Sequence, residues 1–149
     1  MPEQETIERA REDAREGKSP STQAGEFVRE EIHHVREGKH GVRSPQQAIA
    51  IGLSKARRAG VKLAPPKGSA SVWRKAAQDQ RAGEHPRRTV SGKRSRATEK
   101  ALQHESHGFV SKAALAKQGS RAAAKRGRSA RTRAAAQAAR TRKANRHSR

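Results

Sequence analysis

Cysteine and tyrosine are absent from this sequence of 149 residues, which also holds only one tryptophan and two phenylalanines. Without cysteine, the chain forms no disulfide and no thiolate zinc site, which suits a reducing compartment. Alanine supplies most of the hydrophobic residues, which make up 31% of the chain, and the mean hydropathy is −1.13. We therefore expect at most one small hydrophobic core.

Long apolar segments are also missing. No run of about 18 apolar residues occurs, so the sequence predicts no membrane span and no membrane partner. The first residues are acidic and lack the apolar stretch of a signal peptide. These features lead us to expect a cytoplasmic protein.

Acidic residues are scarce beyond the first quarter of the chain, and the last one is Glu105. Residues 1–37 contain ten acidic and six basic side chains, whereas residues 38–149 contain four acidic and 29 basic ones. The net charge is +21 and the isoelectric point is about 11.7. A charge of this size and distribution predicts that the larger, basic part of the chain binds a polyanion.

Two helix starts can be recognised from their capping residues. Ser19-Pro20 and Ser44-Pro45 each place serine at the N-cap and proline at the first helical position, and Gln47 completes a capping box after Ser44. An apolar stripe follows each start, and a glycine, at 38 or at 60, ends each helix. The predicted core residues are Phe27, Val28, Ile32, Val35, Ile49, Leu53 and either Val61 or Leu63.

The predicted fold is mainly α-helical, with a small hairpin of two to three helices in the N-terminal half and a disordered or conditionally helical basic tail. Residues 1–18 form an acidic, charged helix or arm, residues 19–66 the helical hairpin, residues 67–94 a flexible linker, and residues 95–149 a tail rich in Ala, Arg and Lys. We expect the tail to be disordered alone because like charges repel along an isolated helix, and to become helical where phosphates neutralise it.

The tail is the main candidate for nucleic-acid binding. Residues 106–149 contain 13 basic residues, 13 alanines and no acidic residue. Each Lys or Arg that neutralises a phosphate releases counterions, and the planar guanidinium of Arg contacts two phosphate oxygens at once. The predicted phosphate contacts of the tail are Lys112, Lys117, Arg121, Lys125, Arg126, Arg128, Arg131, Arg133, Arg140, Arg142, Lys143 and Arg146.

A second basic patch is predicted in the hairpin, at the end of its last helix and in the loop before that helix. The candidate nucleic-acid-binding residues of this patch are Lys39, Arg43, Lys55, Arg57, Arg58 and Lys62. The alternative role of those near the helix C-terminus is to complement the helix dipole. A helix-turn-helix reader is not expected, because the connection is too long and no Asn or Gln stands beside the arginines to read bases.

Seven histidines prompt a search for a metal site, and the densest group is His33, His34, Glu37 and His40. Their spacing matches no zinc signature, so we expect surface histidines, with His34 paired to Glu30 one turn earlier. We find no nucleophile–base arrangement, no phosphate-binding glycine loop and no paired carboxylates in an apolar pocket. We therefore predict no metal, no cofactor and no enzymatic activity.

Residues 19–66 contain a distinctive stretch at 47–60, QAIAIGLSKARRAG. This segment resembles a family of small basic proteins of bacteria and phages whose function is unknown and which are often labelled DNA-binding. The resemblance implies a bacterial or phage source and carries over no catalytic residue. In composition alone, the Ala/Arg/Lys tail is similar to the tails of linker-histone-like bacterial proteins.

These features predict a nucleic-acid-binding protein of the nucleoid-associated type, which holds phosphate backbones without sequence preference. DNA is the first candidate ligand and RNA the second, so an RNA- or ribosome-associated basic protein is one alternative. Another alternative is a protein-interaction or virion component whose hairpin binds a partner while the tail mainly keeps the protein in solution. The sequence leaves open whether the protein has a protein partner or forms a homo-oligomer.

Overall fold

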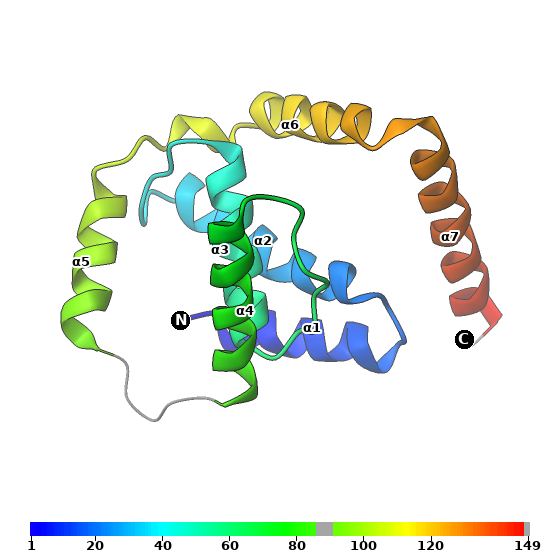
Figure 1. The fold of residues 1–149 in the computed structure, drawn as a ribbon, viewed down its shortest axis with the longest axis horizontal. Coiled ribbons are helices and arrows are strands. Elements are labelled where there is room, and N and C mark those ends of the chain that lie inside the picture. The colour runs from blue at the N-terminus through cyan, green and yellow to red at the C-terminus, as the bar shows by residue number, and fades with distance from the viewer. Residues whose placement is uncertain (86–90, 148–149) are drawn as a thin grey trace. The chain divides into compact units, whose positions relative to one another are not determined.

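The computed structural model describes residues 1–85 and 91–147, and its regular structure there is entirely helical. The chain divides into two units, residues 1–110 and residues 111–149. The first unit contains α1 (Gln4–Arg15), α2 (Pro20–Arg36), α3 (Pro45–Arg58), α4 (Ala70–Glu84), α5 (Gly92–Gln103) and a short 3₁₀ helix, η1 (Gly108–Val110). The second unit contains α6 (Lys112–Lys125) and α7 (Gly127–His147) (Figure 1).

The two helix starts predicted from capping residues are confirmed. Ser19 Oγ accepts a hydrogen bond from the Thr22 N–H at 3.4 Å, and Ser44 Oγ accepts one from the Gln47 N–H at 3.1 Å. Gln47 Oε1 in turn accepts a hydrogen bond at 2.8 Å from the N–H of Arg43, the residue before the N-cap. This reciprocal pair therefore fixes both the start of α3 and the end of the loop that leads into it.

A first cluster of buried side chains joins α1, α2 and α3. Phe27 of α2 is fully buried there, against Ala10 of α1 and Ala56 of α3. Val61, which follows α3, closes the cluster. Residues 1–18 were expected to form a helix or an arm, and the structure has a helix there, α1, whose apolar side is buried on α2.

A second cluster lies between the end of α2 and the start of α3. It holds Val35 of α2, Val42 of the α2–α3 loop, Ala48 of α3 and Val110 of η1, all of them fully buried. The C-terminal part of α2 shares this cluster with the N-terminal part of α3, and the first cluster joins Phe27 of α2 to Ala56 near the end of α3, so the two helices run in opposite directions.

The predicted core is partly confirmed. Three of its residues are buried, namely Phe27, Val35 and Val61. The others are half-buried, namely Val28, Ile32, Ile49, Leu53 and Leu63.

A segment far along the chain completes the second cluster. The N–H of Gly41 donates to the carbonyl oxygen of Leu102 at 2.9 Å, and the N–H of Val42 donates to that of Ser106 at 2.8 Å. Arg36 Nε donates to the carbonyl oxygen of Val110 at 3.1 Å. Residues 102–110 are therefore attached to the α2–α3 loop by backbone hydrogen bonds as well as by apolar contacts.

The contact between α2 and α3 is close enough to require glycine at position 52. A Cβ atom built on Gly52 would lie 2.6 Å from Cα of Val28 and 2.9 Å from its Cγ2. These distances are shorter than real Cβ contacts, so the two helix backbones approach each other at a point where only glycine fits.

The predicted two- to three-helix hairpin with a disordered or conditionally helical tail is wrong. The described residues form seven α-helices that extend through nearly the whole chain. Helix α4 lies where a flexible linker was expected, and α5, α6 and α7 occupy the predicted tail. Residues 86–90 of that linker and residues 148–149 of that tail lie outside the described residues.

The helical tail has a local explanation. Ser111 caps α6 by accepting a hydrogen bond from the Ala114 N–H at 3.2 Å, and alanine has the highest helix propensity. In α7, six uncharged residues, all alanine except Gln137, separate Arg133 from Arg140. The prediction gave too much weight to repulsion between cations and too little to this alanine content. Gly127, with a φ of 73°, is the first residue of α7 and interrupts the helical run after α6.

Candidate nucleic-acid interface

Most of the cations predicted in the first unit already have intramolecular partners. Arg43 Nε lies 2.6 Å from a carboxylate oxygen of Glu105, the residue three before η1, although the Arg43 side chain is 77% exposed. Lys39 Nζ lies 3.2 Å from Glu37 and 3.4 Å from Glu3. Glu37, and after it Glu3, raise the pKa of Lys39 above its ordinary value, which keeps this amine charged.

Lys55 points inward, towards two adjacent carboxylates of α2. Its Nζ lies 3.1 Å from Glu30 Oε1 and 2.8 Å from Glu31 Oε2, and both carboxylates are buried. Burial opposes the charge of Lys55, but contact with Glu31, and then with Glu30, outweighs it and raises the pKa of the amine. Lys55 therefore belongs to the interior of the α2–α3 pair.

Two arginines at the end of α3 also take part in packing. Arg57 is buried and its guanidinium donates to the carbonyl oxygen of Ala64 at 3.5 Å. Arg58 Nε lies 2.9 Å from Oδ1 of Asp79, a buried residue of α4. Lys62, in contrast, is exposed, and among the described residues it has no ion pair or hydrogen bond.

Asp79 is a structural residue that the sequence reasoning missed. It accepts a hydrogen bond from Ser54 Oγ at 2.7 Å and also contacts Lys75 and Arg58. Burial opposes its ionisation, but these contacts, that with Lys75 first, outweigh burial and lower the pKa of Asp79. One sequence signal was available, because Asp79 is the only acidic residue between Glu37 and Glu84.

The basic side chains of the second unit have no acidic residues near them in the sequence, unlike those of the first unit. All of the predicted tail residues are exposed, and no acidic residue occurs between 111 and 149. Lys117, Arg121 and Lys125 follow one another at four-residue steps on α6, so they share one face of that helix. This face offers positive charge at intervals of about 6 Å.

A second basic face can be traced along α7. Arg128 and Arg131 lie at its beginning and Arg142 and Arg146 near its end, all on the same side of the helix. The stripe between these pairs is filled by alanines. Since each residue advances the helix by about 1.5 Å, the four arginines extend over roughly 27 Å.

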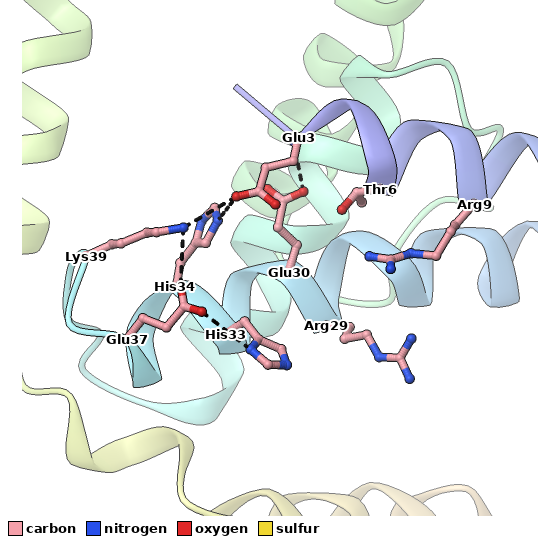
Figure 2. Close-up of a pocket in the computed structure, with 9 residues that line it drawn as sticks. All are labelled: Glu3, Thr6, Arg9, Arg29, Glu30, His33, His34, Glu37 and Lys39. Carbon is pink, nitrogen blue, oxygen red and sulfur yellow. Dashed lines mark hydrogen bonds and ion pairs between the residues drawn. The ribbon is translucent and has the colours of Figure 1, made fainter.

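A shallow recess of about 370 Å³ lies between α1 and α2 in the first unit (Figure 2). His34 Nε2 lies 3.0 Å from Glu3 Oε1, and the backbone N–H of Glu3 donates to Glu30 Oε2 at 3.0 Å. The expected pairing of His34 with Glu30 is therefore replaced by a pairing with Glu3. Contacts with His34, and then with Lys39, lower the pKa of the Glu3 carboxyl.

Charges of both signs line this recess, and their mutual contacts leave no surplus of one sign. Burial opposes the charge of Glu30, but its polar contacts, led by Thr6 and the backbone N–H of Glu3, lower its pKa. The lining residues are Glu3, Thr6, Arg9, Arg29, Glu30, His33, His34, Glu37 and Lys39. Such a surface does not resemble a phosphate-binding site.

The histidines are not all surface residues. His33 is exposed, but His34 and His40 are half-buried, and together with the buried Glu31 they form a group that can hold a metal ion. Their ligand atoms lie within 4.8 Å of one another. The sequence had singled out His34 and His40 but not Glu31, which the turn after α2 brings next to His40.

One family model matches the chain, over residues 15–68, and it is described as a family of unknown function, DUF6496. The matched range contains α2 and α3 and ends before α4, so it covers about a third of the chain. It includes the whole of residues 19–66, for which the sequence suggested a family of unknown function. No curated protein and no solved structure matches the chain.

Within the described residues, no helix has both the length and the apolar character that crossing a membrane requires.

Proposed function

We propose that the protein binds nucleic acid, DNA in the first instance, through sequence-independent contacts between phosphates and the basic side chains of α6 and α7. One observation carries this proposal. Most of the candidate cations of the first unit are held by carboxylates or by backbone, whereas those of α6 and α7 are exposed on a segment without acidic residues.

The helical form of these segments supports a backbone-binding role. Duplex DNA carries one negative charge per about 1.7 Å of its axis, so a basic face some 27 Å long meets many phosphates at once. Each neutralised phosphate releases counterions, which favours binding regardless of base sequence. The alanines between the arginine pairs of α7 have short side chains, so the helix can approach the duplex closely.

The proposed role is that of a nucleoid-associated binding protein rather than an enzyme. Proteins that residues 19–66 resemble are often labelled DNA-binding, which agrees with the proposal. That segment ends before α4, however, so the resemblance does not concern the helices to which we assign the contacts. The assignment therefore depends on the charge and exposure of α6 and α7 themselves.

The test compares two full-length variants that lose the same number of positive charges. In the α7 variant, Arg128, Arg131, Arg142 and Arg146 become Gln, whose helix propensity is close to that of Arg. In the control variant, Lys62, Lys67, Arg74 and Arg81 become Gln. These four are exposed residues of the first unit and form no ion pair with another described residue.

Affinity for a labelled random duplex is measured by fluorescence anisotropy over a salt series. If about ten phosphate contacts form, log K falls against log salt with a slope near −9. We expect the α7 variant to reduce the magnitude of the slope by about 3 to 4, and the control variant to change it much less. Equal losses in both variants, or an unchanged slope in the α7 variant, would contradict the assignment to α7.

A competition experiment then decides between the two ligands. Structured RNA and duplex DNA compete for the protein at one fixed salt concentration, since affinities for polyanions compare only at equal salt. Stronger competition by DNA supports a nucleoid role. Stronger competition by RNA assigns the same basic faces to RNA.

A further inference from the structure

The loop between α2 and α3 brings two histidines to a buried carboxylate. We propose that Glu31, His34 and His40 bind one divalent transition-metal ion, of which Zn²⁺ is the representative. This inference is independent of nucleic-acid binding, because all three residues lie in the first unit and none of them belongs to α6 or α7.

The spacing on α2 places two of the ligands side by side. Glu31 and His34 are three residues apart, so their side chains emerge from the same face of the helix. A Glu-x-x-His pair on a helix is an established way of presenting a carboxylate and an imidazole to one metal ion. His40, in the following loop, supplies the third ligand.

Glu31 is a buried carboxylate whose hydrogen-bonding capacity is not satisfied. Its side chain is 0% exposed, with Oε1 3.2 Å from His40 Nε2 and Oε2 2.8 Å from Lys55 Nζ. Despite these short distances, neither oxygen accepts a hydrogen bond of acceptable geometry from a described residue. Burying a carboxylate without such hydrogen bonds destabilises the folded state, and a metal ion bound to Oε1 would offset this destabilisation.

The negative charges of Glu30 and Glu31 are not fully balanced by the positive charge of Lys55. Glu30 and Glu31 are both buried, and among the described residues Lys55 is the single amine that contacts the two of them. One negative charge therefore remains on the side of Glu31 that faces His40. A cation held between these two side chains balances it.

The surrounding contacts orient the ligands as a metal site requires. His40 Nδ1 lies 3.1 Å from the carbonyl oxygen of Gly41, which can only accept, so Nδ1 is the donor of that contact. Nε2, which lies 3.2 Å from Glu31 Oε1, is thus the nitrogen that binds the metal ion. Metal-binding histidines characteristically donate their second N–H to such a carbonyl group, and metal-binding carboxylates are themselves held by a further partner, here Lys55.

The distances suit a small ion with nitrogen and oxygen ligands. On a tetrahedral Zn²⁺ with bonds of about 2.0–2.1 Å, neighbouring ligand atoms are separated by roughly 3.3 Å. His40 Nε2 and Glu31 Oε1 are 3.2 Å apart. Two imidazoles with one carboxylate favour Zn²⁺, Co²⁺, Ni²⁺ or Cu²⁺ over Mg²⁺ and Ca²⁺. A water molecule completes the tetrahedral coordination.

The experiment titrates the metal-free, full-length protein with Co²⁺, whose visible absorption reports its coordination, in the absence of nucleic acid. Zn²⁺ is then added as a competitor. We expect one equivalent of Co²⁺ to bind and Zn²⁺ to displace it. His34→Gln and His40→Gln should each weaken binding by at least about tenfold, because each removes a metal ligand.

The matched control is His33→Gln, which alters the neighbouring histidine of the same helix. The side chain of His33 is 62% exposed and lies outside the proposed ligand set. This variant should bind Co²⁺ as the unchanged protein does. Circular dichroism of each variant verifies that the helices persist, and the histidine variants are preferred to Glu31→Gln because Glu31 is fully buried beside Lys55.

Two results would overturn the proposal. One is the absence of saturable binding of one equivalent of Co²⁺ or Zn²⁺ to the unchanged protein. The other is binding that His40→Gln and His33→Gln weaken to the same extent. In the first case the contact between His40 and Glu31 is an imidazolium–carboxylate ion pair.

Discussion

The guanidinium Nε of Arg58 lies 2.9 Å from Oδ1 of Asp79, and this pair joins the end of α3 to α4. The side chain of Asp79 is 2% exposed, whereas that of Arg58 is 55% exposed. Ser54 and Lys75 contact the same carboxylate. Asp79 is thus the shared acceptor of the junction, while Arg58 is one of several donors.

Because Asp79 is buried and shared whereas Arg58 is half-exposed, we expect substitutions of the two residues to lower the free energy of unfolding by different amounts. Asp79→Asn removes the charge that three side chains contact, so we expect a loss of about 1–3 kcal/mol in the free energy of unfolding. Arg58→Gln leaves Ser54 and Lys75 in place and removes a half-exposed cation, so the loss should be about 0–1 kcal/mol. Denaturant unfolding of both variants measures the difference. Equal losses would mean that the ion pair, not the carboxylate, dominates the junction.

The same residue makes stability depend on pH. Because folding lowers the pKa of Asp79, its contribution is complete above its ordinary pKa and is lost as the pH falls through the lower pKa of the folded state. Between about pH 5 and pH 3, the unchanged protein should therefore lose more stability than Asp79→Asn does. Thermal unfolding of the two proteins at several pH values gives the comparison. Glu84→Gln, at an exposed position of α4, is the control and should follow the unchanged protein.

Two glycines inside helices should respond in opposite directions to alanine. Gly52→Ala places a methyl group against the backbone of Val28, so we expect destabilisation by about 1–3 kcal/mol. Gly25→Ala, on the exposed side of α2 with no atom within 4 Å of the added Cβ, should stabilise the protein by about 0.5–1 kcal/mol. Denaturant unfolding again decides, and stabilisation by Gly52→Ala would refute the close approach of α2 and α3.

Lys55 stabilises the interior of the α2–α3 pair, whereas Lys62 is exposed at the surface, so substitutions of these two lysines should have different effects. Lys55→Gln removes the amine that contacts both Glu30 and Glu31, so the free energy of unfolding should fall by about 2–4 kcal/mol. Lys62→Gln should change stability by less than about 0.5 kcal/mol. In the folded protein, Lys55→Gln should leave the salt dependence of nucleic-acid binding unchanged. A weaker salt dependence at full helix content would show that Lys55 does reach phosphate.

Local signals in the sequence were sufficient for the elements that depend on neighbouring residues. Ser19 and Ser44 begin α2 and α3 as predicted, because an N-cap serine acts on N–H groups within three residues. The apolar stripe containing Phe27 and Val35 was recognised for the same reason, since helical periodicity appears within one window of the sequence.

Contacts between distant residues were not predictable in this way. Val42 was not among the predicted core residues, yet it is fully buried against Val110, which follows it by almost seventy residues. Asp79 was passed over because its partners, Ser54 and Arg58, lie on another helix. The group formed by Glu31 and His40 depends on the path of the intervening loop, which no spacing rule describes.

The place of Val110 in the second buried cluster bears on the order in which the protein is made. A growing chain acquires its N-terminal residues first, and domains generally fold as units as they emerge. The α2–α3 pair is synthesised early. Its second buried cluster, however, lacks the Val110 side chain until residue 110 has been added, about three quarters of the way along the chain. Residues 15–68, which match a family model, therefore need Val110 to complete the second of their two buried clusters. If translation stopped between α4 and Val110, this cluster would remain partly exposed to solvent.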